Sequence, residues 1–395
     1  MGRAKIPSTR IRLLGVIRSS INSRSHARMI WKRNNTLLCA RLTVVFTLVF
    51  SITQRTQLSA QPIVALGQNF TGSTLQVDST AVPPDSDGAV GPLHYVELLN
   101  GRFSVFTKNN HTKVKTMTDL TFWAQAGITL PSGWDVTDPR VVFDTASQRW
   151  FASEVDFDPT GNINTNRFLL AVSSTADPTG TWRAVAIPGD PGGNDFADFP
   201  TLGVDGVGVS LSSDMFDANS NPVGPTLVFV PKTSLLANPP TSAGMTWFGV
   251  MSYNTRGNIL QPVNCFDGSG QGNVLGVGSV GIDDFGNFVT NRSLILSQVK
   301  TNGSGKATIS SSTLTVPPYT VPLNPAQPDG SNSLDDGDAR ISASFMRSVA
   351  CCTQRIPLSW ATRQSSAGIA SIQPNKLYWR AAPSAILSKI YITRR

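Results

Sequence analysis

The sequence predicts an all-β protein, a β-propeller of about five to seven four-stranded blades, with an incomplete last blade as an open alternative. Two observations support this fold class. Residues 138–188 contain four short β-branched and aromatic runs in succession, each ended by turn residues, and the stretches on either side repeat the same punctuation. The chain also lacks a sustained helical period beyond its leader. Four strands in a row with no helix between them are typical of one propeller blade.

The unit at 138–188 shows the pattern most completely. Its predicted strands are Val141–Phe143, Arg149–Val155, Phe168–Val172 and Thr181–Ile187. The residues Asp144–Ser147 and Asp177–Gly180 supply Asp, Ser, Pro and Gly, which are the residues that form tight turns.

Further units begin near Asp85, Asp198, Leu260 and Asp338. The spacing between unit starts is roughly fifty to eighty residues, in the range of propeller repeats with long loops. A large β-sandwich is the alternative, but it does not explain why most units restart with an Asp or Pro before a small apolar run.

The domain organisation predicted from these units has three parts. Residues 1–60 form an N-terminal extension with a signal peptide, 61–347 form the propeller, and 348–395 form an irregular or truncated final blade. The last segment is set apart because Cys351 and Cys352 interrupt an expected strand and the end carries no turn residues. A propeller must close its ring to protect its edge strands, and no closing unit is evident there. A non-functional truncated product is therefore a third alternative for the chain as a whole.

The leader predicts export. Arg41 precedes the apolar run Leu42–Phe50, and Leu58–Ala60 offers small residues for cleavage, so we expect a secreted or cell-surface protein cleaved near Ala60. The apolar run is shorter than the roughly 20 residues that a membrane span needs. An uncleaved membrane anchor remains the alternative.

Charge excludes nucleic acid as a partner. The chain has 33 basic and 25 acidic residues, but residues 1–60 hold eleven of the basic residues and none of the acidic ones. The remaining body is slightly acidic and has no basic footprint. It also lacks a phosphate-binding Gly-rich loop with Lys, which argues against nucleotides.

Several motifs resemble a group of exported bacterial β-propeller proteins that are mostly uncharacterised. They are Pro83–Pro92 with Val96–Phe103, Asp138–Asp144 with Gln148–Phe151, Ala171–Ser173 with Asp177–Trp182, and Asp198–Gly203. The resemblance covers about residues 83–345. A looser likeness links the chain to sialidase-type and glycosidase propellers, because Ser174–Trp182 is similar to an Asp-box turn with one residue too many between its Asp and its Gly. Complete relatives continue into a further blade that this sequence lacks.

Carboxylates at the starts of innermost strands are the candidate catalytic residues. Such positions line the mouth of the central channel, and glycoside hydrolysis needs one protonated and one ionised carboxyl group. We predict Asp138 as the base, with Glu154 or Asp198 as the acid. The alternative is that these aspartates accept backbone N–H groups in turns, which the repetition of an acidic residue from unit to unit favours.

Ligand and metal sites are predicted at the same strand starts. The expected ligand-binding residues are Asp87, Arg140, Asp338 and Arg340. Asp85, Asp87 and Asp336 are spaced as in calcium loops, although no EF-hand is present, and solvated turns are the alternative.

The function predicted is an extracellular or cell-surface binding or structural module, with glycans as candidate partners. Tryptophans 123, 134, 150, 182 and 247 would stack on sugar rings if exposed, or pack between blades if buried. The alternative function is a glycoside hydrolase that uses the carboxylates at the channel mouth, so enzymatic activity stays open. Catalysis by Ser or Cys with His is disfavoured, because the body has only His94 and His111 and no Gly-x-Ser-x-Gly elbow.

Overall fold

The computed structural model describes residues 69–161, 165–268, 272–278, 290–301 and 306–320, the single residues 330 and 341, and strands at 345–347, 368–373 and 376–381. The chain divides into two compact units, Met1–Asn69 and Phe70–Arg395. All structural statements below concern the second unit. The predicted signal peptide therefore lies outside the described residues.

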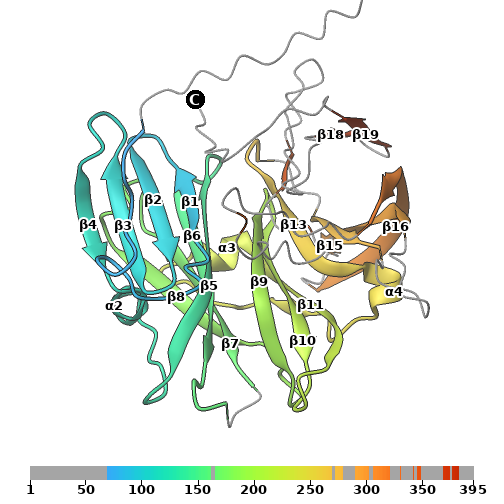
Figure 1. Ribbon diagram of the computed structural model, residues 1–395, viewed down its shortest axis with the longest axis horizontal. Helices are drawn as coiled ribbons and strands as arrows, with labels where there is room; N and C mark the ends of the chain where they lie inside the picture. The colour runs from blue at the N-terminus through green and yellow to red at the C-terminus, as the bar shows by residue number, and fades with distance from the viewer. Residues whose placement is uncertain are drawn as a thin grey trace, which may run out of the picture. The chain divides into compact units, whose positions relative to one another are not determined.

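The second unit contains three four-stranded antiparallel sheets and a further sheet in which a fifth, parallel strand joins four antiparallel ones (Figure 1). The first is β1 (Asp87–Val90), β2 (His94–Leu99), β3 (Arg102–Thr107) and β4 (Lys113–Met117). The second is β5 (Asp135–Asp144), β6 (Arg149–Phe157), β7 (Arg167–Ser173) and β8 (Trp182–Pro188). The third is β9 (Phe196–Val204), β10 (Gly208–Phe216), β11 (Pro222–Pro231) and β12 (Thr246–Trp247). The fourth is β13 (Asn258–Cys265), β14 (Asn273–Val277), β15 (Asn291–Thr301) and β16 (Ala307–Tyr319).

The order of the strands identifies these sheets as propeller blades. Within each sheet the strands follow chain order, and the first strands β1, β5, β9 and β13 lie next to one another in that sequence. A fifth unit begins beside the fourth blade, because β17 (Phe345–Arg347) pairs in parallel with β13. A separate hairpin joins β18 (Gly368–Gln373) to β19 (Lys376–Ala381). The predicted all-β propeller is confirmed, while the total number of blades stays a prediction.

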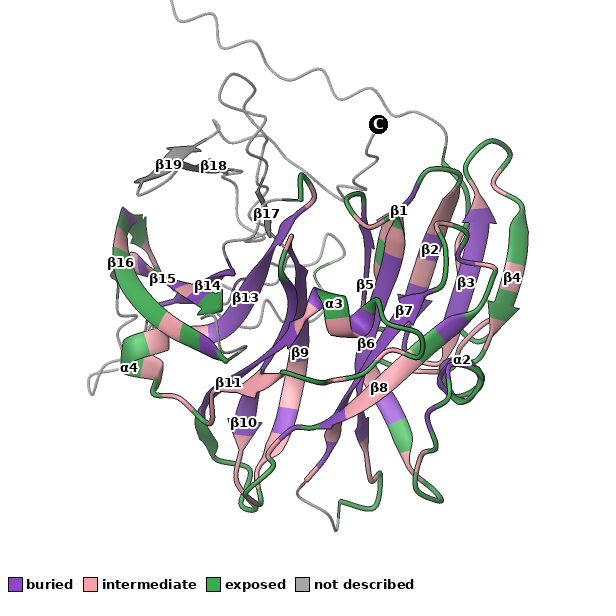
Figure 2. Ribbon diagram, turned by 180° about the vertical axis from the view of Figure 1, so that it is seen from behind, coloured by how far each residue is buried: buried purple, intermediate pink, exposed green. Residues whose placement is uncertain are grey.

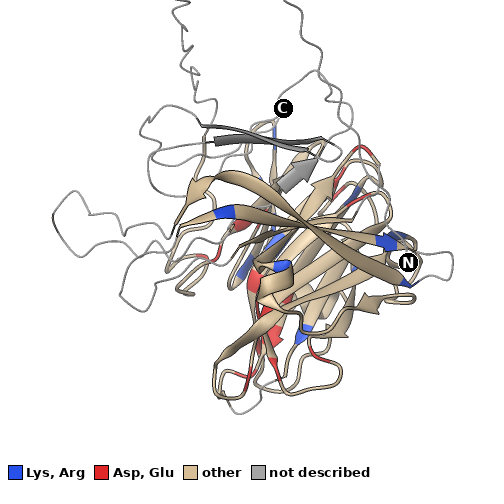
Figure 3. Ribbon diagram, turned by 90° about the vertical axis from the view of Figure 1, so that its right-hand side faces the viewer, with Lys and Arg blue, Asp and Glu red and all other residues tan. Residues whose placement is uncertain are grey.

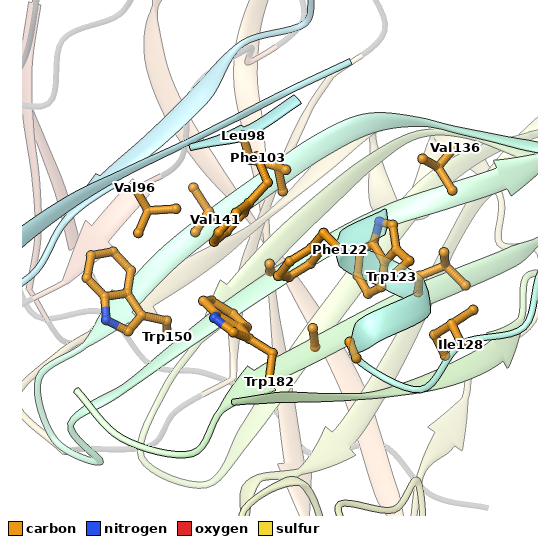
Figure 4. Packing of buried hydrophobic residues seen from close by; sticks show 14 of the residues in the cluster. Val96, Leu98, Phe103, Phe122, Trp123, Ile128, Val136, Val141, Trp150 and Trp182 are labelled. Atoms are coloured by element: carbon orange, nitrogen blue, oxygen red, sulfur yellow. The ribbon is translucent and has the colours of Figure 1, made fainter. Parts of the chain in front are cut away.

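The blades are held together by apolar packing between their faces. Between the first and second blades, Phe103, Phe122, Trp150 and Trp182 belong to one buried cluster (Figure 4). Phe122 stacks on Phe103 with 4.5 Å between ring centroids, and Trp182 meets both rings edge-on. A second cluster joins the second and third blades through residues that include Phe151, Phe168, Leu202 and Val228. Burying each large side chain of this kind stabilises the fold by about 1.5–3 kcal/mol.

Burial differs strongly from strand to strand. Every residue of β14 is buried, and β13 is buried apart from its first residue, whereas β4 and β16 expose many side chains to solvent (Figure 2). The exposed residues of β16 are mainly Ser and Thr, which form strands readily without adding apolar surface.

Three short helices occur in the described part of the chain. They are α2 (Asp119–Gln125), α3 (Lys232–Leu235) and α4 (Tyr253–Arg256). The hydroxyl of Thr118 accepts a hydrogen bond from the backbone N–H of Thr121 and so caps α2. Helix α2 connects the first and second blades and packs Phe122 and Trp123 between them. Among the described residues, no helix has the length and apolar character that crossing a membrane requires.

Candidate functional site

The inner strands share one irregularity near their starts. Asp138, Phe199 and Ile259 have left-handed backbone conformations, with φ of 60°, 53° and 42°. Next to each of them, the pairing of β5, β9 and β13 with the following strand shifts register. Asp85, just before β1, has a φ of 39° and occupies the corresponding place in the first blade. Such conformations are uncommon for residues other than Gly and cost about 1–3 kcal/mol each, so the surrounding contacts must hold them.

Carboxyl groups from three consecutive blades interact electrostatically at these positions. Asp138 of the second blade forms a side-chain hydrogen bond with Asp85 of the first and feels the charge of Asp198 of the third. Asp85 is exposed, and Asp138 and Asp198 are half-buried, so solvent reaches the group. We call Asp85, Asp138 and Asp198 the carboxyl cluster. Figure 3 shows the acidic positions in red, on strands and also on loops, and the basic positions in blue.

The carboxyl cluster retains a proton well above the usual range of an aspartate. Burial raises the pKa of Asp138 most, and the charges of Asp198 and Asp85 raise it further, to about 6. The hydrogen bond to Asp85 acts in the same direction, because protonated Asp138 donates it and ionisation would break it. The cluster can therefore hold one proton among negative charges near neutral pH.

Asn100 forms hydrogen bonds with two members of the carboxyl cluster, Asp85 and Asp138. Its side-chain amide donates to Asp85 Oδ2 over 2.8 Å and to the carbonyl oxygen of Pro83 over 3.1 Å. Its side-chain oxygen accepts the backbone N–H of Asp138 over 3.0 Å. One buried side chain thus fixes both left-handed aspartates relative to each other.

Two of the predicted ligand-binding residues link neighbouring blades instead of facing solvent freely. Asp87 Oδ2 accepts the backbone N–H of Val141 over 2.9 Å. Arg140 Nε donates to the carbonyl oxygen of Pro200 over 3.0 Å, and its guanidinium group lies 5.2 Å from the centre of the Phe199 ring. Asp338 and Arg340, the other two, lie outside the described residues.

Glu154 differs from the carboxyl cluster in its surroundings, although its charge interacts with that of Asp138, and its predicted role as the acid stays a prediction. It is fully buried on β6, where Trp123 Nε1 donates to its Oε2 atom. Its Oε1 atom has no hydrogen-bond partner. Burial raises the pKa of Glu154 well above its ordinary range, and the charge of buried Asp119 raises it further. Glu154 lies on β6 opposite the register shift of β5 at Asp138. Because side chains alternate between the two faces of a strand, the Glu154 side chain points towards the core.

Asp85 and Asp87, two of the residues predicted to bind calcium, have different hydrogen-bond partners. Asp85 pairs with Asn100 and Asp138, while Asp87 accepts the N–H groups of Gly88 and Val141. Within the described ranges, no group of three or more His, Cys, Asp or Glu side chains is arranged to hold a metal ion. Asp336 lies outside these ranges, so calcium binding stays a prediction.

Most of the tryptophans considered for sugar stacking belong to the core. Trp123, Trp150 and Trp182 are buried, and Trp134 and Trp247 are half-buried. The turn similar to an Asp box is structural, because Asp177 accepts the backbone N–H of Thr179 and Trp182 Nε1 donates to the carbonyl oxygen of Pro178. Packing between blades is thus the role of the three buried rings.

Sequence reasoning missed two members of the site. Asn100 and Phe199 entered the sequence analysis only as members of the motifs Val96–Phe103 and Asp198–Gly203, without a role at the site. A signal for Asn100 existed, since an Asn that follows a strand can accept and donate through its side chain at once. No local signal marks Phe199, whose position depends on the neighbouring blade.

Comparison with known proteins adds the following findings. No family model matches the sequence, and no curated protein does. Among solved structures, the chain is similar to an arabinanase from Bacillus subtilis, with 14% identity, a TM-score of 0.32, and coverage of 77% of this chain and 90% of the arabinanase. It is also similar to an exo-1,5-α-L-arabinanase from a bovine ruminal metagenomic library, with 12% identity, a TM-score of 0.30, and coverage of 75% and 86%. A subtype N11 neuraminidase-like protein of A/flat-faced bat/Peru/033/2010 is similar at 9% identity and a TM-score of 0.32, over 77% and 73% of the two chains.

Similarity of this extent assigns no activity to the chain. The resemblance to exported bacterial propellers stays a prediction from the motifs. The arrangement of the four sheets and the carboxyl cluster between their inner strands together define a β-propeller with a candidate polar site at the starts of its first three blades.

Proposed function

We propose that this protein is an exported propeller that binds glycans at the carboxyl cluster. The observation that carries the proposal is that Asn100 ties Asp85 to Asp138 through hydrogen bonds, while Asp198 of the third blade interacts electrostatically with Asp138. Three blades contribute one carboxyl group each to a place that solvent reaches, and two of these groups sit in strained backbone conformations. Strain of this kind clusters at functional sites.

Sugar hydroxyls are a suitable partner for such a cluster. Ionised carboxylates accept hydrogen bonds that are roughly twice as strong as those of neutral acceptors, and a pyranose presents several neighbouring O–H donors. Polyanionic partners are disfavoured, because the body outside the first 60 residues has 22 basic and 25 acidic residues. The leader at residues 1–60 would deliver the propeller to the cell exterior, where such glycans occur.

A glycoside hydrolase is the second candidate, and one observation favours it. Asp138 has a pKa of about 6, and the charges of Asp198 and Asp85 act on it. Hydrolysis of a glycosidic bond needs a carboxyl group that keeps its proton and another that is ionised. In this role, Asp138 would donate the proton and Asp198 or Asp85 would carry the negative charge, which reverses the role of base predicted for Asp138 from the sequence.

A glycan array tests the proposed function. The full-length protein is applied with and without Ca²⁺, beside the D138N variant. We expect the wild-type protein to retain a defined class of glycans and the D138N variant to lose it. Absence of any retained glycan in both conditions would contradict the proposal.

The retained glycans then separate binding from hydrolysis. Incubation with wild-type protein is followed by measurement of released reducing ends between pH 4 and 8. A hydrolase would release reducing ends with an alkaline limb near pH 6, because activity falls as Asp138 loses its proton. Retention without release supports the binding module.

A further inference from the structure

The residue two places after each left-handed position contacts the next blade. These residues are Asp87, Arg140, Thr201 and Gln261, which follow Asp85, Asp138, Phe199 and Ile259. Asp87 accepts the N–H of Val141, and Arg140 donates to the carbonyl oxygen of Pro200. Thr201 Oγ1 donates to the carbonyl oxygen of Leu260 over 2.7 Å, and Gln261 Nε2 donates to that of Ile341 over 2.6 Å.

Four equivalent contacts form a series around the inner strands. Each runs from the side chain of one inner strand to the backbone of the next unit, and the first three end close to the irregularity of the neighbouring inner strand. The fourth reaches Ile341, just ahead of β17, so the fifth unit is attached in the same way. Because each bond reaches the backbone and not a side chain, it fixes the position of the neighbouring strand whatever residues that strand carries.

Within this series, Arg140 lies at the carboxyl cluster. Its bond to Pro200 and its packing against Phe199 hold the two residues that directly follow Asp198. Asp198 Oδ1 accepts the N–H of Phe199 over 2.9 Å, so its side chain is tied to the same short segment. A displacement of this segment would move the Asp198 carboxylate away from Asp138.

We propose that Arg140 is a positioning residue, which holds β9 against β5 and so keeps the Asp198 carboxylate beside the Asp138 carboxyl group. The importance of this role for glycan binding rests on the proposed function, whereas the contacts of Arg140 are independent of it. The groups that face Asp138 come from four elements: Asp85 precedes β1, Asn100 follows β2, Glu154 lies on β6 and Asp198 on β9. Arg140 acts on Asp138 through the last of these.

The test reads the carboxyl groups directly and needs no glycan. Full-length protein labelled with ¹³C at the aspartate side-chain carboxyl carbon is titrated by NMR, and the midpoint of Asp138 is followed. We expect a midpoint near 6 in the wild-type protein. The D198N variant lowers it, because the neighbouring negative charge is gone. The R140K variant keeps its positive charge but loses the planar guanidinium group that donates and stacks at the same time, so the midpoint also falls.

A double variant separates positioning from a direct effect. If Arg140 acts through Asp198, R140K adds nothing to the shift that D198N already causes. R167K is the matched control, because Arg167 is another arginine of the second blade and its Nε donates to Asp156 over 2.7 Å. This variant should leave the titration midpoint of Asp138 unchanged. An R140K midpoint equal to that of the wild type, or fully additive shifts in the double variant, would overturn the proposal.

If R140K fails to fold, F199L carries the comparison. It removes the ring beneath the guanidinium group while Arg140 itself remains. It must then lower the Asp138 midpoint in the same direction, and an unchanged midpoint contradicts the proposal. A failed glycan array leaves all of these outcomes unaffected, so the two proposals can fail separately.

Discussion

At the scale of single residues, the aspartates that recur near the starts of the inner strands are not equivalent in the structure. The sequence suggests that Asp87, Asp138 and Asp198 are equivalent starts of strands, but the left-handed positions show that Asp85 is the counterpart of Asp138. Asp198 precedes its own left-handed residue by one place. The irregularity in each strand spans only one or two residues, and its position decides which aspartate reaches the site. Amino-acid composition alone does not reveal that position.

Glu154 gives a prediction that concerns stability rather than binding. Its pKa is raised in the folded protein, so the native state keeps a proton that the unfolded chain releases above the ordinary value of 4.5. Stability therefore falls as the pH rises from that value towards the folded pKa. The E154Q variant cannot ionise, so its free energy of unfolding should fall less over this range and exceed that of the wild type at the upper end.

Urea unfolding of the wild type and E154Q between pH 4 and 8 checks this expectation. E97Q serves as the control for the change of a carboxyl group to an amide, because Glu97 is half-buried and accepts bonds from Ser73. Parallel curves of stability against pH for the wild type and E154Q would contradict the account.

At the scale of elements, the sequence predicted the second blade almost completely. Predicted strands at 141–143, 149–155, 168–172 and 181–187 correspond to β5, β6, β7 and β8, because alternating apolar residues and strong turn residues coincide there. In contrast, β16 was missed, since its exposed Ser and Thr residues carry no apolar period. Helix α2 was missed because seven residues are too few to show one.

The turn between β5 and β6 is held to the third blade by a buried ion pair. Lys232 Nζ lies 2.6 Å from Asp144 Oδ2, and both side chains are almost fully buried. Lys232 also donates to the carbonyl oxygen of Asp205. The K232M variant leaves the Asp144 carboxylate buried without its cation, which should cost about 3–5 kcal/mol.

Urea unfolding at neutral pH measures this cost. K113M is the matched control, because Lys113 forms a 2.9 Å pair with Asp78 in a more exposed setting and should contribute only about 0–1 kcal/mol. A loss of stability in K232M no larger than that in K113M would refute a structural role for the buried pair.

At the scale of the whole molecule, the fold brings distant residues to one place. Asp85 and Asp198 lie in different blades, and only the side-by-side arrangement of β1, β5 and β9 lets both reach Asp138. Sequence analysis could predict the propeller and could name all three aspartates, but it could not tell which of them meet. Its assignments of Glu154 to the site and of Asp85 to calcium stay predictions, since proximity across blades depends on the register of three separate strands.

The most direct test of the central claim measures glycan affinity at the carboxyl cluster. Titration calorimetry compares the wild type, D138N and D177N with the glycan that the array selects. Asp177 is an exposed aspartate in a structural turn of the same blade, so D177N should bind as the wild type does. We predict that D138N weakens binding at least tenfold, because a hydrogen bond to a charged group contributes about 1.5–3 kcal/mol. Equal affinity of D138N and the wild type would contradict the assignment of the site.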